Sequence, residues 1–289
     1  MLNVNEIENC PTFKPNENEL NKCREMLTTL STERGMSNLK EEPDIESLLC
    51  YFEKDELYDY LSKMLMCLMC IDVKFNRPSF VKKILKICPE AARRCTTHEK
   101  MLSHHLVVIR YYGSAVLPSD QYELLTLLGN VYPSGFSQPN KYGELPLHII
   151  CSHPLPCKLS FNYILNMYPY AVKCPTISGK MPLHCIFRSP SADINYNALK
   201  DTILQLLNKG ASPALVEVEE KVRVLRWNSI NNSGNTTTID ETDIRKWSPL
   251  TRAIEKDLQW FINFIHYRCF TIHHHDDMTR KLGIIKDIY

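Results

Sequence analysis

Glycine is scarce in this 289-residue chain, which contains only nine, and the motifs that depend on glycine are missing. There is no Gly-x-Gly-x-x-Gly or P-loop to bind phosphate, and no Gly-x-Ser-x-Gly elbow to present a nucleophile. A catalytic-cysteine signature is also lacking, and no pair of carboxylates stands out from ordinary surface charge. We therefore expect no enzymatic activity and no cofactor.

The chain also lacks an excess of either charge and a long apolar run. Its formal net charge is +1, so no global field attracts nucleic acid, and we expect no nucleic-acid partner. The longest apolar stretch, residues 64–73, is too short to cross a bilayer and contains Asp72, so we expect no membrane insertion. Residues 1–11 have neither the basic nor the apolar part of a signal peptide. These absences predict a cytoplasmic protein, with the nucleus as the alternative.

Disulfides are a further expected absence, although the chain has twelve cysteines. Several of them, including Cys67, Cys88 and Cys185, lie in apolar helical segments, where a free thiol behaves as a small hydrophobic group. For a long chain without a signal peptide, a reducing compartment is the better interpretation.

One cluster has the residue types of a zinc site, because His and Cys are common zinc ligands. It consists of His148, Cys151, His153 and Cys157. His148, however, belongs to a repeated motif, and Cys151 falls where that repeat has a small buried residue. We therefore expect no metal, and a zinc or catalytic site built from these four residues is the alternative.

The repeated motif is Pro-Leu-His. Pro146-Leu147-His148 recurs 36 residues later as Pro182-Leu183-His184, and each copy follows a glycine, Gly143 or Gly179. Tyr-Pro pairs at 132–133 and 168–169 have the same spacing. Two landmarks with one period of this length indicate a helical solenoid.

The unit resembles the ankyrin repeat, whose signature is Gly-x-Thr-Pro-Leu-His-x-Ala over roughly 33 residues. Its Tyr-Pro-x-Ala form resembles divergent arrays of algae and other protists. Gly143 and Gly179 suit a turn with positive φ, and the two prolines suit the first turn of a helix. The resemblance implies an all-α, ankyrin-like helical repeat solenoid with short hairpin tips. Leu145 and Met181 replace the family's Thr, so His148 and His184 are expected to bond a neighbouring backbone carbonyl.

Weaker copies extend the array to four repeats over residues 74–272. Residues 100–104 keep only the His, while Pro249 and Leu250 keep Pro-Leu after Ser248, which can cap the helix. Leu206 to Pro213 resembles the end of the family's second helix, with Gly210 just after it.

The remaining segments receive simpler predictions. Residues 1–44 are polar and mostly expected to be mobile, with residues 20–30 as a candidate helix. Residues 45–73, with apolar residues at helical spacing, predict two short helices that cap the array or form a degenerate repeat, and residues 273–289 predict a cap at the other end. Residues 215–242 form an insertion in which valines alternate with charged residues, which predicts a β-finger.

The resemblance implies a non-catalytic scaffold that binds a partner protein through its tips and concave face. The matching tip positions are Thr97, His98, Lys100, Lys141, Tyr142, Glu144, Ile177, Ser178, Lys180, Ile244, Arg245 and Trp247. Tyr142 and Trp247 are the most informative, because exposed aromatics are enriched in binding hot spots; the alternative is that each packs on the insertion or on a neighbouring tip. A second hypothesis is an adaptor whose segment 1–44 docks to an enzyme.

Overall fold

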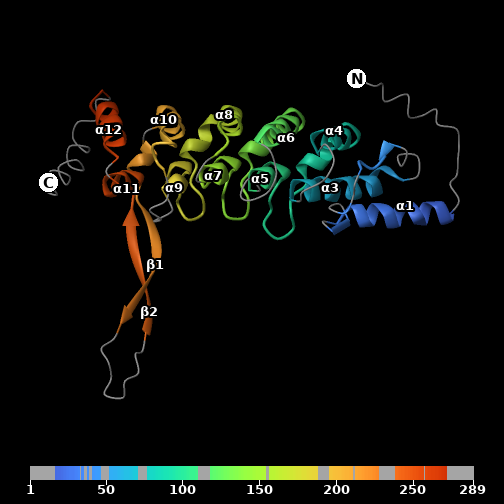
Figure 1. Cartoon of the computed structure of the whole chain (residues 1–289), viewed down its shortest axis with the longest axis horizontal. Helices are drawn as coiled ribbons and strands as arrows, with labels where there is room; N and C mark the ends of the chain where they lie inside the picture. The colour runs from blue at the N-terminus through green and yellow to red at the C-terminus, as the bar shows by residue number, and fades with distance from the viewer. Residues whose placement is uncertain are drawn as a thin grey trace, which may run out of the picture. The chain divides into compact units, whose positions relative to one another are not determined.

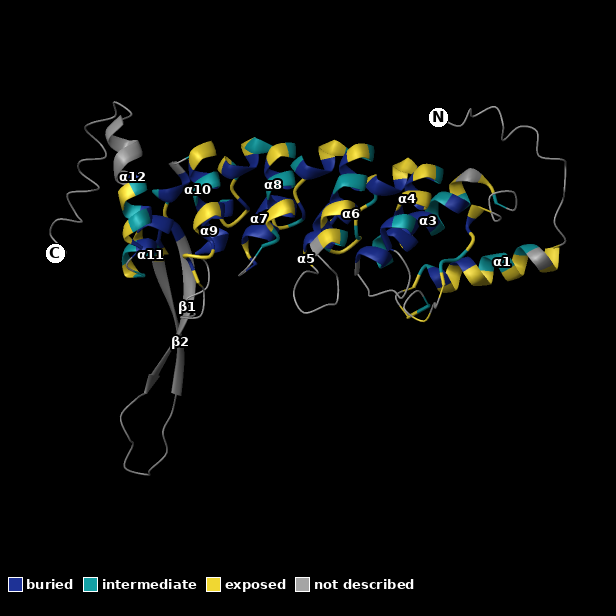
Figure 2. Cartoon of the chain, turned by 45° about the horizontal axis from the view of Figure 1, so that its top comes forward, coloured by how far each residue is buried: buried dark blue, intermediate teal, exposed yellow. Residues whose placement is uncertain are grey.

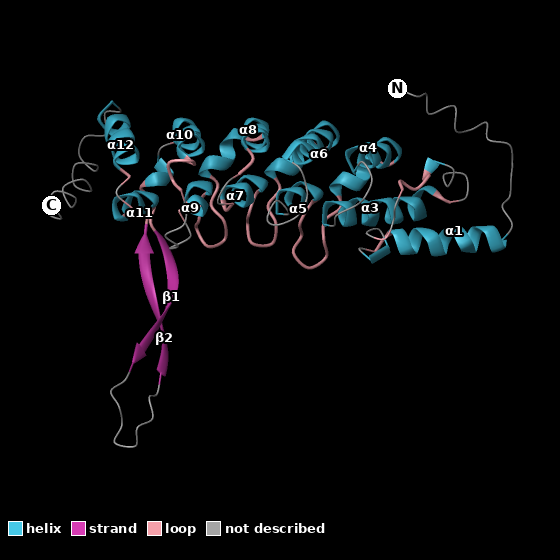
Figure 3. Ribbon diagram, in the orientation of Figure 1, coloured by secondary structure: helices cyan, strands magenta, loops and turns pink. Residues whose placement is uncertain are grey.

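The computed structural model describes residues 17–32, 34–35, 38, 41–46, 52–70, 77–109, 118–153, 156–187, 195–210, 212–227, 238–256 and 258–271. These residues are mostly helical, as predicted (Figures 1 and 3). The chain divides into two compact units. Unit 1 contains residues 1–150 and 156–168, and unit 2 contains residues 151–155 and 169–289.

Unit 1 consists of helices joined by short 3₁₀ segments. Its elements are α1 (Glu17–Leu30), α3 (Lys54–Cys70), α4 (Arg77–Ile87), η3 (Pro89–Arg93), α5 (Ser103–Ile109), α6 (Pro118–Val131), η4 (Pro133–Ser137), α7 (Pro146–Cys151, the last residue in unit 2) and α8 (Lys158–Met167). Helix α3 packs on α5, α4 packs on α6, and α6 packs on α8. Buried residues line the facing sides of these helices (Figure 2).

Helix α3 shows how the sequence builds this core. Leu61, Met64, Leu65 and Leu68 follow helical spacing and are completely buried, which is the single apolar stripe of an amphipathic helix. Of the two short helices predicted for the cap, the second is present as one helix of 17 residues. The first falls largely on residues 47–51, which lie outside the described residues. No helix in the described part of the chain is long and apolar enough to cross a membrane.

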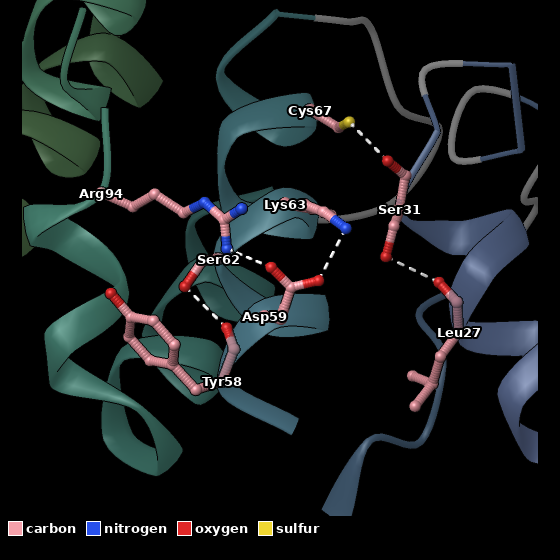
Figure 4. Close-up of polar contacts among 8 residues, drawn as sticks. All are labelled: Leu27, Ser31, Tyr58, Asp59, Ser62, Lys63, Cys67 and Arg94. Carbon is pink, nitrogen blue, oxygen red and sulfur yellow. Dashed lines mark hydrogen bonds and ion pairs between the residues drawn. The ribbon is translucent and has the colours of Figure 1, made fainter. Parts of the chain in front are cut away.

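The segment 1–44 contains a packed helix, α1, which confirms the candidate helix at residues 20–30 and corrects the expected mobility for residues 17–30. Leu27 and Leu30 of α1 are buried, and Arg24 Nε lies 2.9 Å from Glu56 Oε1 on α3. The Cys67 thiol donates to the carbonyl of Ser31 at 3.3 Å (Figure 4). Helix α1 therefore belongs to unit 1, because its few apolar residues fall on one face.

A charged cluster joins α3 to the end of η3. Asp59 accepts hydrogen bonds from Lys63, one turn further along α3, and from Arg94 (Figure 4). The bonds from Lys63 and then Arg94 lower the pKa of the Asp59 carboxyl. All three side chains are partly exposed, so we expect a stabilisation of less than about 1 kcal/mol per pair.

Three connections have nearly the same backbone. Cys88, Tyr132 and Tyr168 each precede a proline that opens a 3₁₀ segment, with φ/ψ of −134/79°, −139/73° and −142/79°. A following proline disfavours the α region for the residue before it, so each α-helix has to end there. The Cys-Pro and Tyr-Pro pairs thus mark the same structural position three times.

Unit 2 combines helices with one β-hairpin. Its elements are η5 (Pro169–Lys173), α9 (Pro182–Ile186), α10 (Lys200–Lys209), η6 (Ser212–Ala214), β1 (Val218–Trp227), β2 (Thr238–Trp247), α11 (Pro249–Glu255) and α12 (Gln259–Thr271). Phe187 lies at its centre, stacked on Tyr196 at 5.2 Å and edge-on to Phe261 at 5.4 Å.

The predicted β-finger is present as an antiparallel pair that extends away from the helices of unit 2 (Figure 1). Its register runs from Val218 opposite Trp247 to Trp227 opposite Thr238. The return strand is longer than predicted and ends at residue 247 instead of within 215–242. The reason is geometric, because the chain has to run back along the whole of β1 to reach Ser248, where α11 begins. The predicted cap at 273–289 lies outside the described residues.

Candidate interaction surface

One hydrogen bond is repeated at the start of three short helices. The residue before the helix donates its backbone N–H to Nδ1 of a histidine three positions later. The pairs are Leu102 and His105 at 3.1 Å, Leu145 and His148 at 3.1 Å, and Met181 and His184 at 3.2 Å. The histidine therefore satisfies a helix-start N–H that Glu or Gln satisfies in a capping box.

The other ring nitrogen of two of these histidines reaches a backbone carbonyl. Because Nδ1 accepts, Nε2 carries the hydrogen and donates, from His105 to Glu144 at 3.1 Å and from His184 to Val216 at 2.7 Å. The predicted carbonyl bond is thus confirmed for His184. Burial lowers the pKa of His105 to about 4 and also lowers the pKa of His184, so both rings stay neutral in the fold at neutral pH.

The fourth copy has a hydroxyl pair in place of the histidine. Ser248 Oγ accepts from the N–H of Thr251 at 3.2 Å, and Thr251 Oγ1 accepts from the N–H of Ser248 at 2.8 Å. This is a complete capping box, and it confirms that Ser248 caps the helix. Pro249 opens α11, as Pro146 opens α7 and Pro182 opens α9.

The first repeat was aligned one residue out of register. The motif histidine of this copy is His105, since His105 and not His104 makes the repeated hydrogen bond. The corresponding glycine position is then Lys100, which has φ of 52°, against 77° for Gly143 and 78° for Gly179. The loop turn before α5 contains one residue more than the loop turns before α7 and α9, so the motif of this copy is shifted relative to theirs.

His104 instead occupies the place that Leu147 and Leu183 hold in the next two copies. Its ring is completely buried and lies edge-on to Phe136 at 4.8 Å. Gly135 makes the space, because a Cβ there would lie 2.4 Å from the ring. Neither ring nitrogen has a hydrogen-bond partner of ordinary geometry in the described residues. Burial, and then the charge of His105, lower the pKa of His104 to about 4.

The turns before the motif are held by a side-chain oxygen at their first residue. Asn140 Oδ1 accepts from the N–H groups of Tyr142 and Glu144, both at 2.9 Å. Thr96 and Thr176 Oγ1 make the equivalent bonds in the first and third turns, at 3.0 and 3.1 Å. Such local bonds are the reason why Asn and Thr suit turns.

Four side chains from the first two turns of unit 1 meet at the surface, and we call them the tip cluster: His98, Glu99, Lys141 and Tyr142. The Lys141 N–H donates to the Glu99 carbonyl at 2.9 Å, which joins the turns. Lys141 Nζ lies 3.0 Å from His98 Nδ1 and 4.9 Å from the centre of the Tyr142 ring. Tyr142 is 45 % exposed, and its hydroxyl donates to Glu99 at 3.3 Å.

Most of the predicted tip residues outside unit 2 therefore lie at the surface. Thr97, His98, Lys100 and Tyr142 are exposed, as predicted for tip positions. Glu144 is half-buried, since its carboxylate accepts from the Asn140 side chain at 3.0 Å. Glu99 was missed, although its place in the turn beside His98 is the signal that could have identified it.

The third turn, in unit 2, is also exposed. Ile177 is 79 % exposed, and Ser178 Oγ lies 3.1 Å from Thr176 Oγ1. Lys180 is half-buried, at the position that Glu144 holds in the second turn. The third turn thus presents an apolar side chain where the second presents Lys141.

Trp247 does not face solvent, which corrects the reason for proposing it as a binding residue. It is only 3 % exposed and lies edge-on to the His184 ring at 5.5 Å, with the Arg252 guanidinium 5.1 Å from its ring centre. The structural alternative, packing at the base of the insertion, therefore describes this residue. Ile244 and Arg245, which were predicted as tip residues beside Trp247, lie within strand β2 and not in a turn.

Gly210 also differs from its prediction. It ends α10, but its φ of −176° is extended backbone that any residue adopts, so it does not supply the left-handed residue typical of a C′ glycine. Leu147, Leu183 and Leu250 are buried, as expected for core positions of the repeat.

The candidate metal residues are used elsewhere. His148 Nδ1 accepts from Leu145, and burial raises the pKa of the Cys151 thiol well above its ordinary value, which disfavours a thiolate ligand. Among the described residues no group of three or more His, Cys, Asp or Glu side chains is placed to hold a metal ion. The described cysteines are free thiols.

The tip cluster offers an ammonium group, an aromatic ring and hydrogen-bonding groups in a fixed arrangement, which suits non-covalent recognition. Its members hold one another in place, so ordering them on binding costs little entropy. Comparison with known proteins adds nothing to this geometry: no protein-family model, curated protein or solved structure matches the chain.

Proposed function

We propose that this chain is an ankyrin-like repeat solenoid that binds another protein through the turns before its short helices. The observation that carries the proposal is the tip cluster, in which Lys141 and Tyr142 of one turn contact His98 and Glu99 of the turn before it. Tyrosine is among the residues most enriched in binding hot spots, and Tyr142 remains 45 % exposed.

The ankyrin-like interpretation is supported by local geometry that recurs with the motif. Three histidines accept the same backbone hydrogen bond, and two glycines share a positive φ near 78°. In such arrays the stability comes from neighbouring repeats, and the His105 bond to the Glu144 carbonyl is a contact of that type. The described free thiols are compatible with a cytoplasmic or nuclear site of action.

The adaptor alternative loses its main support, because residues 17–30 pack on α3 and are no free peptide. The zinc alternative is weakened because His148 Nδ1 already accepts a backbone hydrogen bond and burial keeps the Cys151 thiol protonated by raising its pKa. We therefore propose neither, and the scaffold function remains as the single proposal.

The test begins with a photoreactive residue placed at position 142 and, as the control, at position 122. Tyr122 is a matched control because it is 37 % exposed and lies on α6 of the same unit. A partner that cross-links from position 142 alone is purified, and its Kd is measured for wild type, Tyr142→Ala and Tyr122→Ala.

We expect Tyr142→Ala to weaken binding about 30-fold, the effect of losing a hot spot of about 2 kcal/mol, and Tyr122→Ala to leave it unchanged. Circular dichroism checks that both variants fold. Equal affinities for a folded Tyr142→Ala protein and wild type would show that the turns are not the binding surface.

A further inference from the structure

Lys141 of the tip cluster and Lys100 of the first turn have no carboxylate in contact with them among the described residues. Within these residues the Lys141 ammonium contacts the His98 ring nitrogen at 3.0 Å and the face of Tyr142. The Lys100 side chain is exposed and, within the part of the chain that the structure describes, makes no hydrogen bond or ion pair. In the described part of the chain the exposed Lys100 and the half-buried Lys141 therefore have no direct counter-charge.

The acidic residues of the same turns are bonded to neutral donors. Glu99 accepts from the Tyr142 hydroxyl at 3.3 Å, and Glu144 accepts from the Asn140 side chain at 3.0 Å. Neither carboxylate pairs with a lysine of the turns, so a carboxylate from another molecule can approach Lys100 and Lys141 without displacing an ion pair.

Lys100 is costly for the turn in which it lies. Its φ of 52° is the left-handed conformation that glycine adopts at positions 143 and 179. For a residue with a Cβ this conformation costs about 1 kcal/mol or more. Glycine would adopt this conformation without the steric cost, so the lysine is not there to favour the backbone of the turn.

The turns do not have the construction of a phosphate site. Phosphate sites commonly use free backbone N–H groups and the forked guanidinium of arginine. Here the N–H groups of Lys100, Lys141 and Gly143 donate to the backbone carbonyls of Thr96, Glu99 and Asn140. The remaining recognition groups are two separate point charges and an aromatic ring, which suit carboxylates spaced along a peptide.

We propose that Lys100 and Lys141, with the ring of Tyr142 beside Lys141, bind an acidic peptide segment of the partner protein. The Asp or Glu side chains of this segment pair with the two ammonium groups, and its chain covers Tyr142. This inference rests on the proposed function and specifies the chemistry of the partner. The contacts of Lys141 with His98 and Tyr142 already order its side chain, which limits the entropy lost on binding.

The test is an NMR titration of the full-length, ¹⁵N-labelled protein with hexaglutamate, hexalysine or inorganic phosphate. We expect hexaglutamate to shift the amide signals of residues 98–101 and 140–144, with a Kd that increases with salt concentration. The double variant Lys100→Gln/Lys141→Gln is expected to weaken this binding about tenfold, consistent with two exposed ion pairs. The matched control is Lys82→Gln/Lys86→Gln, which removes two exposed lysines of α4.

Several results would overturn the inference. They are equal shifts with hexalysine, shifts with phosphate alone, hexaglutamate shifts outside the two turns, and equal loss of binding in both double variants. Failure of the proposed function is distinguishable. If the cross-linked partner is lost by Tyr142→Ala but kept by Lys100→Gln/Lys141→Gln, the scaffold function stands and the acidic segment does not.

Discussion

Tyr142 in unit 1 and Trp247 in unit 2 both precede a Pro-Leu helix, yet their surroundings are opposite. Tyr142 lies in a compact turn held by Asn140 and stays 45 % exposed. Trp247 ends a ten-residue strand, and its ring is buried on His184. The two residues hold different motif positions, because Trp247 lies two residues before its proline, as the half-buried Glu144 does, whereas Tyr142 lies four residues before Pro146. The comparison teaches that an aromatic side chain near the motif faces solvent or the core according to its position and the segment that carries it.

The largest expected effect on stability concerns the motif leucine of each unit, Leu147 in unit 1 and Leu183 in unit 2. Leu147→Asp and Leu183→Asp should each destabilise the protein by more than about 4 kcal/mol, because each would bury an unpaired carboxylate. Hydrogen exchange should show protection lost first in unit 1 for Leu147→Asp and in unit 2 for Leu183→Asp. Leu159→Asp, at a site 58 % exposed, is the control. An unchanged thermal midpoint for either core variant would contradict the repeat register.

Alanine variants of Trp247 and Tyr142 compare the stability contributed by a buried and by an exposed aromatic side chain. Trp247→Ala should lower the free energy of unfolding by about 3 to 5 kcal/mol through lost burial, whereas Tyr142→Ala should lower it by less than about 1 kcal/mol. Urea unfolding of the two variants measures both values. Similar losses in the two variants would remove the contrast between the turn and the hairpin.

Acid should act strongly on unit 1 through His104. Its folded pKa of about 4 lies below the ordinary 6.5, so the unfolded chain binds a proton that the folded chain excludes. The free energy of unfolding is therefore unaffected by His104 above about pH 6.5. It decreases by about 1.4 kcal/mol per pH unit as the pH falls from there towards 4, because the unfolded chain gains the proton.

His104→Leu tests this, since leucine fills the same position in the next two copies. The loss of stability between pH 6.5 and pH 4.5, measured by urea unfolding, should be smaller in this variant by about 2 to 3 kcal/mol. The exposed His98→Leu serves as the control for removing a histidine from the surface. The same slope in all three proteins would contradict the assignment.

The smallest effect concerns the strained turn. Lys100→Gly should stabilise the protein by about 1 kcal/mol, because glycine adopts a φ of 52° without steric cost. Gly143→Ala, at φ of 77°, should destabilise it by a similar amount. Thermal unfolding compares the two, and a destabilised Lys100→Gly protein would show that lysine contributes to the turn itself.

The strong repeat copies allowed accurate prediction because local physics fixes them. Pro146 and Pro182 begin helices, Gly143 and Gly179 have positive φ, and Leu147 is buried. Errors arose where a local pattern had two interpretations. His104 and His105 are adjacent, and only the hydrogen bond to the Leu102 N–H distinguishes them.

The candidate site was predicted in part for the same reason. The residues of the turns could be read from the motif, so His98, Lys141 and Tyr142 were named. Their contacts join positions more than 40 residues apart in sequence, and no local pattern contains that information. Glu99 was therefore missed, and the local pattern left open whether Trp247 faces solvent or packs at the insertion, which the structure decides in favour of packing.

By itself, the sequence determined the elements whose causes are local: helix starts at proline, turns at glycine, and the first strand of the hairpin from its alternating valines. Only the tertiary structure decided which turns touch, that Lys100 has a strained backbone in the turn whose Glu99 carbonyl bonds Lys141, and that Trp247 is buried. The physical reason is that propensity and hydrogen bonds within a turn act over a few residues, whereas burial and the pairing of charges depend on what distant segments place next to one another.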